Sequence, residues 1–138
     1  MKEDPLSRAS APASFVLFGD YSLIHGGPAV ALAANPRAKC SAQVSGKFTV
    51  NGEDLDQRKH PLAREAVLQG WSDVDQPVSI NVESEIPRGA GLGHHSAMTV
   101  SCLAALSMLH DHMILDDIAK RAFQVSVTLA YPALRNVT

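Results

Sequence analysis

The fold class of this chain follows from one stretch, Ser84-Glu85-Ile86-Pro87-Arg88-Gly89-Ala90-Gly91-Leu92-Gly93-His94-His95-Ser96-Ala97. Just before it, residues 77–84 alternate apolar and polar side chains, which predicts a strand with one buried face. Just after it, apolar residues recur every three or four positions from Met98 to Leu109, which predicts a helix of about fifteen residues starting at His95. The order is therefore strand, glycine loop and helix.

This order favours anion binding at the start of the helix, because the first N–H groups of a helix have no partner within the helix and its amino end carries partial positive charge. Glycines at 89, 91 and 93 let the backbone approach a phosphate without a Cβ in the way. The pattern lacks the Lys-Ser or Lys-Thr pair of a Walker A loop and the G-x-G-x-x-G spacing of a dinucleotide fingerprint. A connection whose glycines only turn the chain remains the alternative.

The residues before the loop predict more strands and one helix. Ser14 to Phe18 is prone to form a strand, and Val30 to Ala34 is expected to be a small-residue segment packed under the sheet. Asn51-Gly52 is a tight-hairpin signal, which predicts an antiparallel pair around it. Helical spacing predicts a helix over 61–70.

After the loop helix, Asp116 or Asp117 is expected to cap a second helix that carries Ile118, Ala122 and Val125. Strands, helix, strand and two helices in this order make the class α+β. Residues 1–10 are polar and are expected to form a flexible leader.

Composition excludes several classes of protein. A length of 138 residues with 46% apolar side chains fits one globular domain with a packed core. A formal charge of −2 with 5% aromatic residues disfavours nucleic-acid binding. The apolar runs are far shorter than a membrane span, and the start lacks the apolar centre of a secretory signal, so a soluble cytoplasmic protein is expected. Two distant thiols, Cys40 and Cys102, are expected to pack in the core.

Two blocks of sequence resemble the GHMP small-molecule kinases, and among them the mevalonate kinases. Residues 11–29, APASFVLFGDYSLIHGGPA, are similar to the opening A-P-G-K-x-x-L-F-G-E-H-x-x-V-Y-G-x-P-A of that family. Residues 84–97 are similar to its ATP loop, S-x-I-P-x-G-A-G-L-G-S-S-A-A. The resemblance implies the amino-terminal half of such a kinase, a ribosomal S5 domain 2-like unit over residues 11–138, without the ferredoxin-like carboxy-terminal domain.

This chain departs from the family at positions that carry the chemistry. Where the family has its lysine the chain has Ser14, and the family's G-E-H appears as Gly19-Asp20-Tyr21. The serine pair of the loop is replaced by His94-His95, and Ser96 follows one position later. A loose match of residues 118–120 to the family's I-A-K would put Ser126 where its metal-binding glutamate stands and its catalytic aspartate near Val137. Losing such groups typically costs about 10² to 10⁴ in rate for each one.

Four histidines near the loop helix invite a metal interpretation, which helix geometry opposes. His94 and His95 lie at one end and His110 and His112 at the other, about 22 Å apart along fifteen helical residues. The second pair is expected on a solvated face. The first pair stands at the amino end of the helix, where a protonated imidazole is disfavoured until an anion arrives. Phosphate binding is therefore expected to strengthen as the pH falls towards 6.

The resemblance implies ATP and Mg²⁺ as ligands and a small alcohol such as mevalonate as the acceptor in isoprenoid biosynthesis. The expected nucleotide contacts are Gly89, Ala90, Gly91, Leu92, Gly93, His94, His95 and Ser96, with Ser96 also towards the metal. Asp20 is expected to face the acceptor as the catalytic acid. Two hypotheses stay open: a kinase whose activity is weak or absent, and a degenerate nucleotide-binding module that acts through association, as a homodimer or with a missing domain. An S5-like nucleic-acid module is the disfavoured third.

Overall fold

A computed structural model describes residues 6–56, 58–71, 76–109 and 115–130 of the chain. Within these residues, nine elements follow one another: β1 (Leu6–Phe18), α1 (Asp20–Ile24), β2 (Val30–Val44), β3 (Thr49–Val50), β4 (Glu53–Asp54), α2 (Pro61–Trp71), β5 (Val78–Ser84), α3 (His94–Leu109) and α4 (Leu115–Ala130). Strands and helices are mixed in this sequence, which confirms the α+β class predicted above.

The strands form one mixed sheet in the order β1-β2-β5-β3-β4. Strand β2 pairs antiparallel with β1 and with β5, whereas β3 runs parallel to β5. The predicted hairpin at Asn51-Gly52 joins β3 to β4, and both turn residues have positive φ values of 51° and 82°. The parallel pairing of β3 and β5 places this turn beside the carboxyl half of β5, next to the glycine loop.

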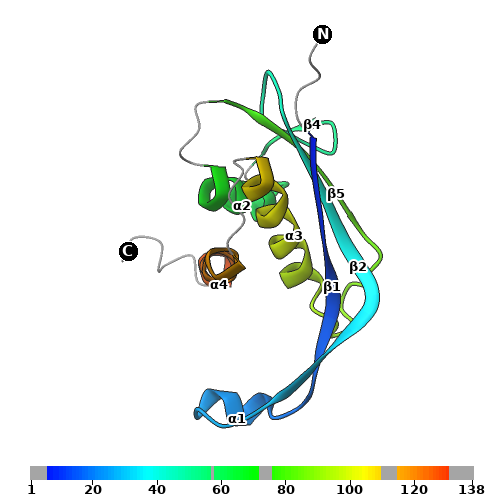
Figure 1. The fold of residues 1–138 in the computed structure, drawn as a ribbon, viewed down its shortest axis with the longest axis vertical. Helices are drawn as coiled ribbons and strands as arrows, with labels where there is room; N and C mark the ends of the chain where they lie inside the picture. The colour runs from blue at the N-terminus through cyan, green and yellow to red at the C-terminus, as the bar shows by residue number, and fades with distance from the viewer. Residues whose placement is uncertain (1–5, 57, 72–75, 110–114, 131–138) are drawn as a thin grey trace.

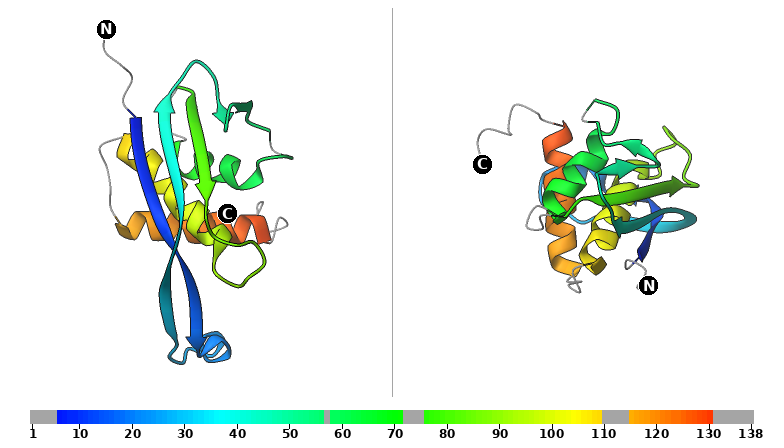
Figure 2. Two further views of the ribbon diagram at one scale, coloured as in Figure 1. Left: turned by 90° about the vertical axis from the view of Figure 1, so that its right-hand side faces the viewer. Right: turned by 90° about the horizontal axis from the view of Figure 1, so that it is seen from above.

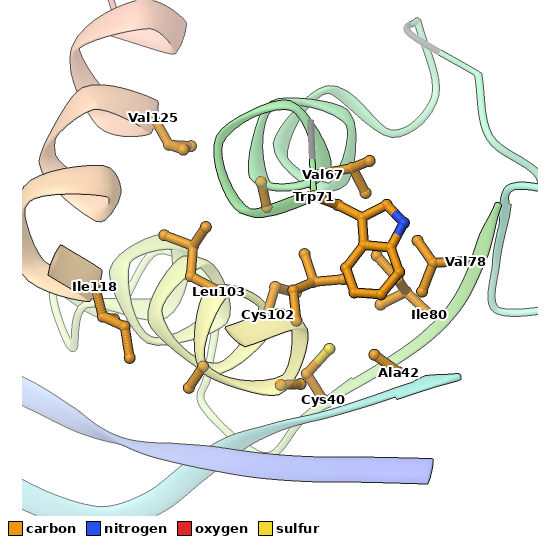
Figure 3. Packing of buried hydrophobic residues seen from close by; sticks show 14 residues of the cluster. Cys40, Ala42, Val67, Trp71, Val78, Ile80, Cys102, Leu103, Ile118 and Val125 are labelled. Carbon is orange, nitrogen blue, oxygen red and sulfur yellow. The ribbon is translucent and has the colours of Figure 1, made fainter. Parts of the chain in front are cut away.

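Helices α2, α3 and α4 all cover the same face of the sheet (Figure 1). The main core lies between them and the sheet, where Trp71, Ile80, Leu103, Ile118 and Val125 are buried (Figure 3). Helix α3 lies between the sheet and the other two helices, and its residues 101–106 are all buried. The helix therefore has a fixed position, and so has the loop that precedes it.

Small residues fill a second core beneath the glycine loop. Ala11, Ala13, Ala38 and Ala97 are buried there around Ile86, which lies two residues after the end of β5. Alanine side chains let the start of α3 approach β1 and β2 closely. The first sequence block and the glycine loop are brought together by this packing.

Strands β1 and β2 extend beyond the rest of the sheet as a two-stranded arm with α1 at its tip (Figure 1, Figure 2). The arm exposes large apolar side chains, with Phe18 60%, Tyr21 84% and Ile24 76% exposed. Isolated exposed apolar residues are ordinary on protein surfaces, whereas large contiguous apolar patches are rare on monomeric proteins.

Most predicted elements are confirmed: a helix over 61–70, a strand up to Ser84, and a helix that starts one residue before His95. Cys40 and Cys102 are buried in the main core as expected. Their thiols share a hydrogen bond, which together with burial raises the pKa of Cys40 and keeps it protonated.

Three expectations were wrong. Residues 6–10, expected in the flexible leader, form the start of β1 and pair with β2 from Leu6↔Gln43 onward. Val30–Ala34 does not pack under the sheet but is the first part of β2, paired with β1. Helix α4 already begins at Leu115, so Asp116 and Asp117 lie in its first turn and do not precede it.

Parts of the sequence analysis fall outside the described residues. These are residues 1–5 of the leader, the histidines at 110 and 112, and the position of Val137. Among the described helices, none is long and apolar enough to cross a membrane.

Candidate functional site: the glycine loop and the adjoining cavity

The glycine loop has the backbone conformation that its three glycines allow. Gly89, Gly91 and Gly93 have φ values of 73°, 74° and 69°, a region that residues with a side chain rarely adopt. Nothing lies within 4 Å of the position that a Cβ would take at Gly89 or Gly91. The loop is therefore open on that side, and its backbone can be approached closely.

The loop is held against strand β1. The N–H of Ser14 donates to the carbonyl of Leu92 at 2.9 Å, and a Cβ at Gly93 would lie 3.0 Å from the Oγ of Ser14. The carbonyl of Gly93 accepts the N–H of Ala97 at 2.9 Å, which is the first hydrogen bond of α3. Gly93 thus precedes the helix as its N-cap and leaves no capping side chain over the helix end.

His94, His95 and Ser96 form the first turn of α3, so their backbone N–H groups lie at the positive end of the helix dipole. His95 and Ser96 are exposed, whereas His94 is buried. The structure therefore brings together every residue from Gly89 to Ser96 that the sequence analysis assigned to the nucleotide site. The geometry suits an anion above the helix end.

A cavity of about 550 Å³ adjoins this helix end. It lies between the β3–β4 hairpin, the end of β5, and the first turns of α2 and α3. Apolar side chains including Val50, Leu62, Val82 and Met98 line part of it, and Asn51, Lys59, His60, Arg88, His94 and His95 supply polar groups. Apolar walls with a few convergent polar groups are typical of small-molecule sites.

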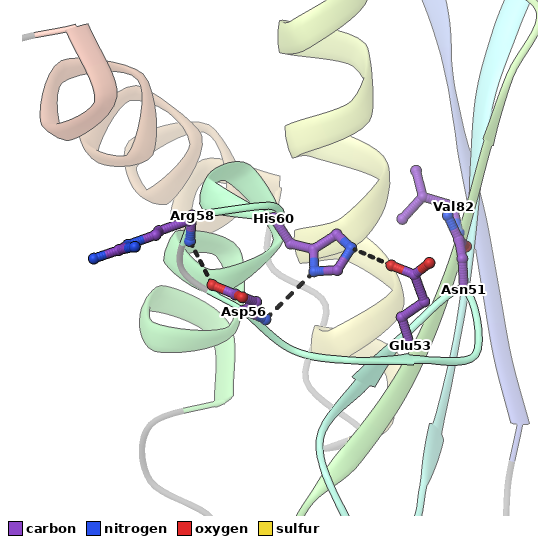
Figure 4. A network of polar contacts seen from close by, with 6 residues as sticks. All are labelled: Asn51, Glu53, Asp56, Arg58, His60 and Val82. Carbon is purple, nitrogen blue, oxygen red and sulfur yellow. Dashed lines mark hydrogen bonds and ion pairs between the residues drawn. The ribbon is translucent and has the colours of Figure 1, made fainter.

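A polar network fixes the wall formed by residues 51–60 (Figure 4). The Oδ1 of Asn51 accepts the N–H of Val82 at 2.8 Å, which ties the hairpin turn to β5. The Nε2 of His60 lies 3.5 Å from a carboxylate oxygen of Glu53, and its Nδ1 accepts the N–H of Asp56 at 3.4 Å. The cavity wall before α2 is thus built from backbone-anchored polar contacts.

His94 connects the cavity to the glycine loop. Its Nδ1 lies 3.1 Å from the Oγ of Ser84 at the end of β5, and its ring packs edge-on against His95 with centroids 5.3 Å apart. Burial lowers the pKa of His94, and the charges of His95 and Arg88 lower it further, while a backbone hydrogen bond at Ile86 acts in the opposite direction. Before an anion binds, protonation of this imidazole is therefore disfavoured, and the stronger phosphate binding expected towards pH 6 stays a prediction.

The other predicted site residue lies elsewhere. Asp20 is the first residue of α1, at the tip of the arm (Figure 1). Residues 15–18 of β1 and Gly19 separate it from Ser14 along the arm. The expectation that Asp20 faces the acceptor stays a prediction.

Comparison with known proteins then assigns the chain to a family. Residues 60–132, more than half of the chain, match the family model of the GHMP kinases N terminal domain. The chain belongs to the GHMP kinase family. It is 38% identical over 108 residues to the mevalonate kinase of Archaeoglobus fulgidus, covering 75% of this chain and 38% of that protein. It is 35% identical over 132 residues to the mevalonate kinase of Methanothermobacter thermautotrophicus, covering 88% of this chain and 43% of that protein.

Solved structures agree with this GHMP kinase fold. The crystal structure of the Methanococcus jannaschii mevalonate kinase superposes with a TM-score of 0.74 at 17% identity, covering 92% of this chain and 47% of that one. The Streptococcus pneumoniae phosphomevalonate kinase gives a TM-score of 0.71 at 15% identity, covering 91% of this chain and 42% of that one. This GHMP kinase chain spans about two-fifths of the length of these curated relatives.

Sequence reasoning missed the cavity side of the site. The sequence pattern marks Asn51 only as a turn residue, and it gives no signal for Lys59, His60, Val82 or Met98 as site residues. The parallel pairing of β3 with β5 brings them together, and this long-range contact has no local signature. The sequence gives one hint of the cavity: the turn at Asn51-Gly52 comes before the strand that leads into the glycine loop.

Proposed function

We propose that this chain is the nucleotide-binding half of a mevalonate-kinase-like phosphotransferase and that it binds ATP at the glycine loop. A single observation carries the proposal. The glycine loop, whose three glycines have positive φ values, leads directly into α3 and lies beside the cavity of about 550 Å³. The triphosphate would contact the backbone N–H groups from Gly89 to Ser96, and the nucleoside would occupy the cavity. The family membership of the chain supports this assignment.

Mg²⁺ would arrive with the nucleotide. Among the described residues, no three His, Cys, Asp or Glu side chains gather into a metal site. Mg²⁺ in phosphoryl-transfer sites is held largely by substrate phosphates and water, with few protein ligands. The exposed Ser96 in the first turn of α3 fits as the protein's oxygen ligand, and the metal would neutralise phosphate charge there.

The acceptor side supports only weak phosphoryl transfer. Phosphoryl transfer needs positive charge on the moving phosphate and a group that positions the attacking hydroxyl. Opposite Gly93 stands the short, uncharged Ser14, and the acidic residue expected to face the acceptor, Asp20, lies at the tip of the arm. We propose that this chain by itself binds ATP in the cytoplasm but phosphorylates mevalonate, or a similar small alcohol, slowly or not at all.

Two measurements on the 138-residue chain test this function. Titration calorimetry with ATP and Mg²⁺ should give saturable binding with one nucleotide per chain. A coupled assay for ADP release, with mevalonate as acceptor, should stay near the background rate. Saturable binding with rapid mevalonate-dependent ADP release would support a competent kinase in place of the weak one, and an absence of ATP binding would refute the proposal.

The apolar arm favours a second function, association. Five large apolar residues on the arm and α1 are at least 40% exposed: Val16, Leu17, Phe18, Tyr21 and Ile24. A second copy of this chain or another domain would cover this surface on binding. Light scattering that shows a monomer at high concentration would count against association between copies.

A further inference from the structure

One buried nitrogen in the site lacks a partner. Among the described residues, the Nε2 of His94 is a buried side-chain atom with no hydrogen-bond partner, while the residue as a whole is 9% exposed. Buried polar atoms are almost always paired, so an orphan calls for an explanation. The ring lines the cavity beside the glycine loop, where a ligand can supply the missing partner.

The other ring nitrogen is held by the end of β5. Nδ1 of His94 lies 3.1 Å from the Oγ of Ser84, and this hydroxyl oxygen also accepts the N–H of Ile86 at 3.1 Å. A hydroxyl both donates and accepts, so a neutral imidazole offers either an N–H or a lone pair at Nε2, according to its tautomer. In either tautomer the unpartnered nitrogen has a fixed position.

We propose that His94 is a nucleotide-positioning residue: its Nε2 forms a hydrogen bond with a polar atom of the nucleotide that occupies the cavity. This inference rests on the proposed function, because it assumes that the ligand is a nucleotide. It gives the imidazole a different role from that of an anion-attracting cation, which the sequence pattern alone suggests.

The charged and titratable groups around the ring differ from His94 in what they offer a nucleotide. Arg88 and His95 face it from the loop and α3, and Lys59 and His60 face the same cavity from the start of α2. Arg88 and Lys59 can supply positive charge to phosphates. His94 instead supplies a hydrogen-bonding nitrogen in a fixed position, which favours a ligand with a polar atom at that point over an isostere that lacks one.

The test compares two substitutions at one position. His94→Leu fills the space without a polar atom, and His94→Gln offers an amide N–H close to the position of Nε2. H94L also removes the contact between Nδ1 and the Oγ of Ser84, so its melting temperature should fall modestly. The affinity of the folded H94L for ATP should fall about tenfold, and H94Q should recover most of this loss. A role in folding alone would leave the ATP affinity of the folded variants unchanged.

The calorimetric titrations use ATP, ADP, AMP and adenosine, with His25→Leu at the exposed end of α1 as the matched control. An equal fold-loss for all four ligands in H94L places the partner atom on the nucleoside, and a loss confined to the ligands that carry phosphate places it on the phosphates. Both results support the proposal. Equal ATP affinity for wild type and H94L overturns it and leaves the proposed function standing. A wild type that binds none of the four ligands overturns both.

If H94L does not fold, the Nε2 nitrogen resonance of His94 in the wild type decides instead. A shift of this resonance on saturation with ATP supports the hydrogen bond. An unchanged resonance, with the nucleotide demonstrably bound, overturns it.

Discussion

A Cβ at Gly93 would lie 3.0 Å from the Oγ of Ser14 and 3.4 Å from its carbonyl oxygen. This close approach joins the two sequence blocks that lie far apart along the chain. Position 93 therefore has little room for a side chain. Its φ of 69° also lies in a backbone region that residues with a side chain rarely adopt. The start of α3 and the middle of β1 therefore constrain each other, and the geometry of the glycine loop depends on both.

Gly93→Ala should consequently destabilise the chain more than Gly89→Ala. Both positions have positive φ, which costs a residue with a side chain about 1–2 kcal/mol. Only position 93 adds a steric contact, because nothing lies within 4 Å of a Cβ at Gly89. Denaturant unfolding should give the larger loss of free energy for G93A. An equal loss of unfolding free energy for both variants would show that the close approach of Ser14 to position 93 does not affect stability.

Much of this arrangement could be predicted from the sequence, and the reason is local. The alternation of Val78, Ile80 and Val82 and the turn at Asn51-Gly52 follow from side-chain periodicity and backbone preference, which neighbouring residues determine. The position of the glycine loop before α3 follows in the same way. The two blocks at residues 11–29 and 84–97 indicate the GHMP kinase family by their sequence alone, and the family model agrees.

The remaining features could not be predicted, because they depend on long-range contacts. Val30–Ala34 is alanine-rich and resembles a packed segment, yet pairing with β1 makes it a strand. Leu6–Ser10 lacks strand signals and is included in β1 because β2 is long enough to pair with it. The cavity requires β3 beside β5, and the buried state of His94 requires Ser84 and Ile86 around it. Side-chain patterns do not encode such pairings.

Asn51→Ala should cost about 1–2 kcal/mol of stability, for two reasons. Asn51 has a φ of 51°, which asparagine tolerates better than alanine, and its Oδ1 accepts the N–H of Val82 at 2.8 Å. Asn51→Asp keeps an acceptor and the tolerance for positive φ, so it should lose clearly less. Thermal unfolding of both variants measures this difference, and an aspartate variant as unstable as the alanine variant would argue against the Asn51–Val82 contact as the cause.

Ser14→Lys should strengthen nucleotide binding, because it places a cation next to the loop where the family has its lysine. An exposed ion pair contributes up to about 1 kcal/mol, or roughly fivefold in affinity for ATP, and salt should weaken the gain. Ala119→Lys on the exposed surface of α4 adds the same charge away from the loop and serves as the control. Calorimetry at low and high salt compares the two. An equal gain from both variants would mean that net charge, and not position 14, is responsible.

Acid should destabilise the wild type more than His94→Gln. The pKa of His94 is lowered in the folded chain, so below the ordinary value of 6.5 the unfolded chain binds a proton that the folded chain does not. Above this pH both states are neutral at this position, and the penalty vanishes. As the pH falls from about 7 to about 5, the free energy of unfolding should therefore decrease more for the wild type than for H94Q. Denaturant titrations at several pH values measure the difference, and parallel pH profiles would contradict the burial of a neutral imidazole.

The central claim, that the glycine loop and the first turn of α3 receive the phosphates of ATP, is tested most directly by the backbone amide resonances of the ¹⁵N-labelled chain. Titration with ATP and Mg²⁺ should shift the amides of Gly89, Gly91, Gly93, His95 and Ser96 saturably and together. Amides on the outer surface of α4, such as that of Ala119, should stay in place. If saturating nucleotide leaves the loop amides unmoved, the loop is a chain turn and not a phosphate site.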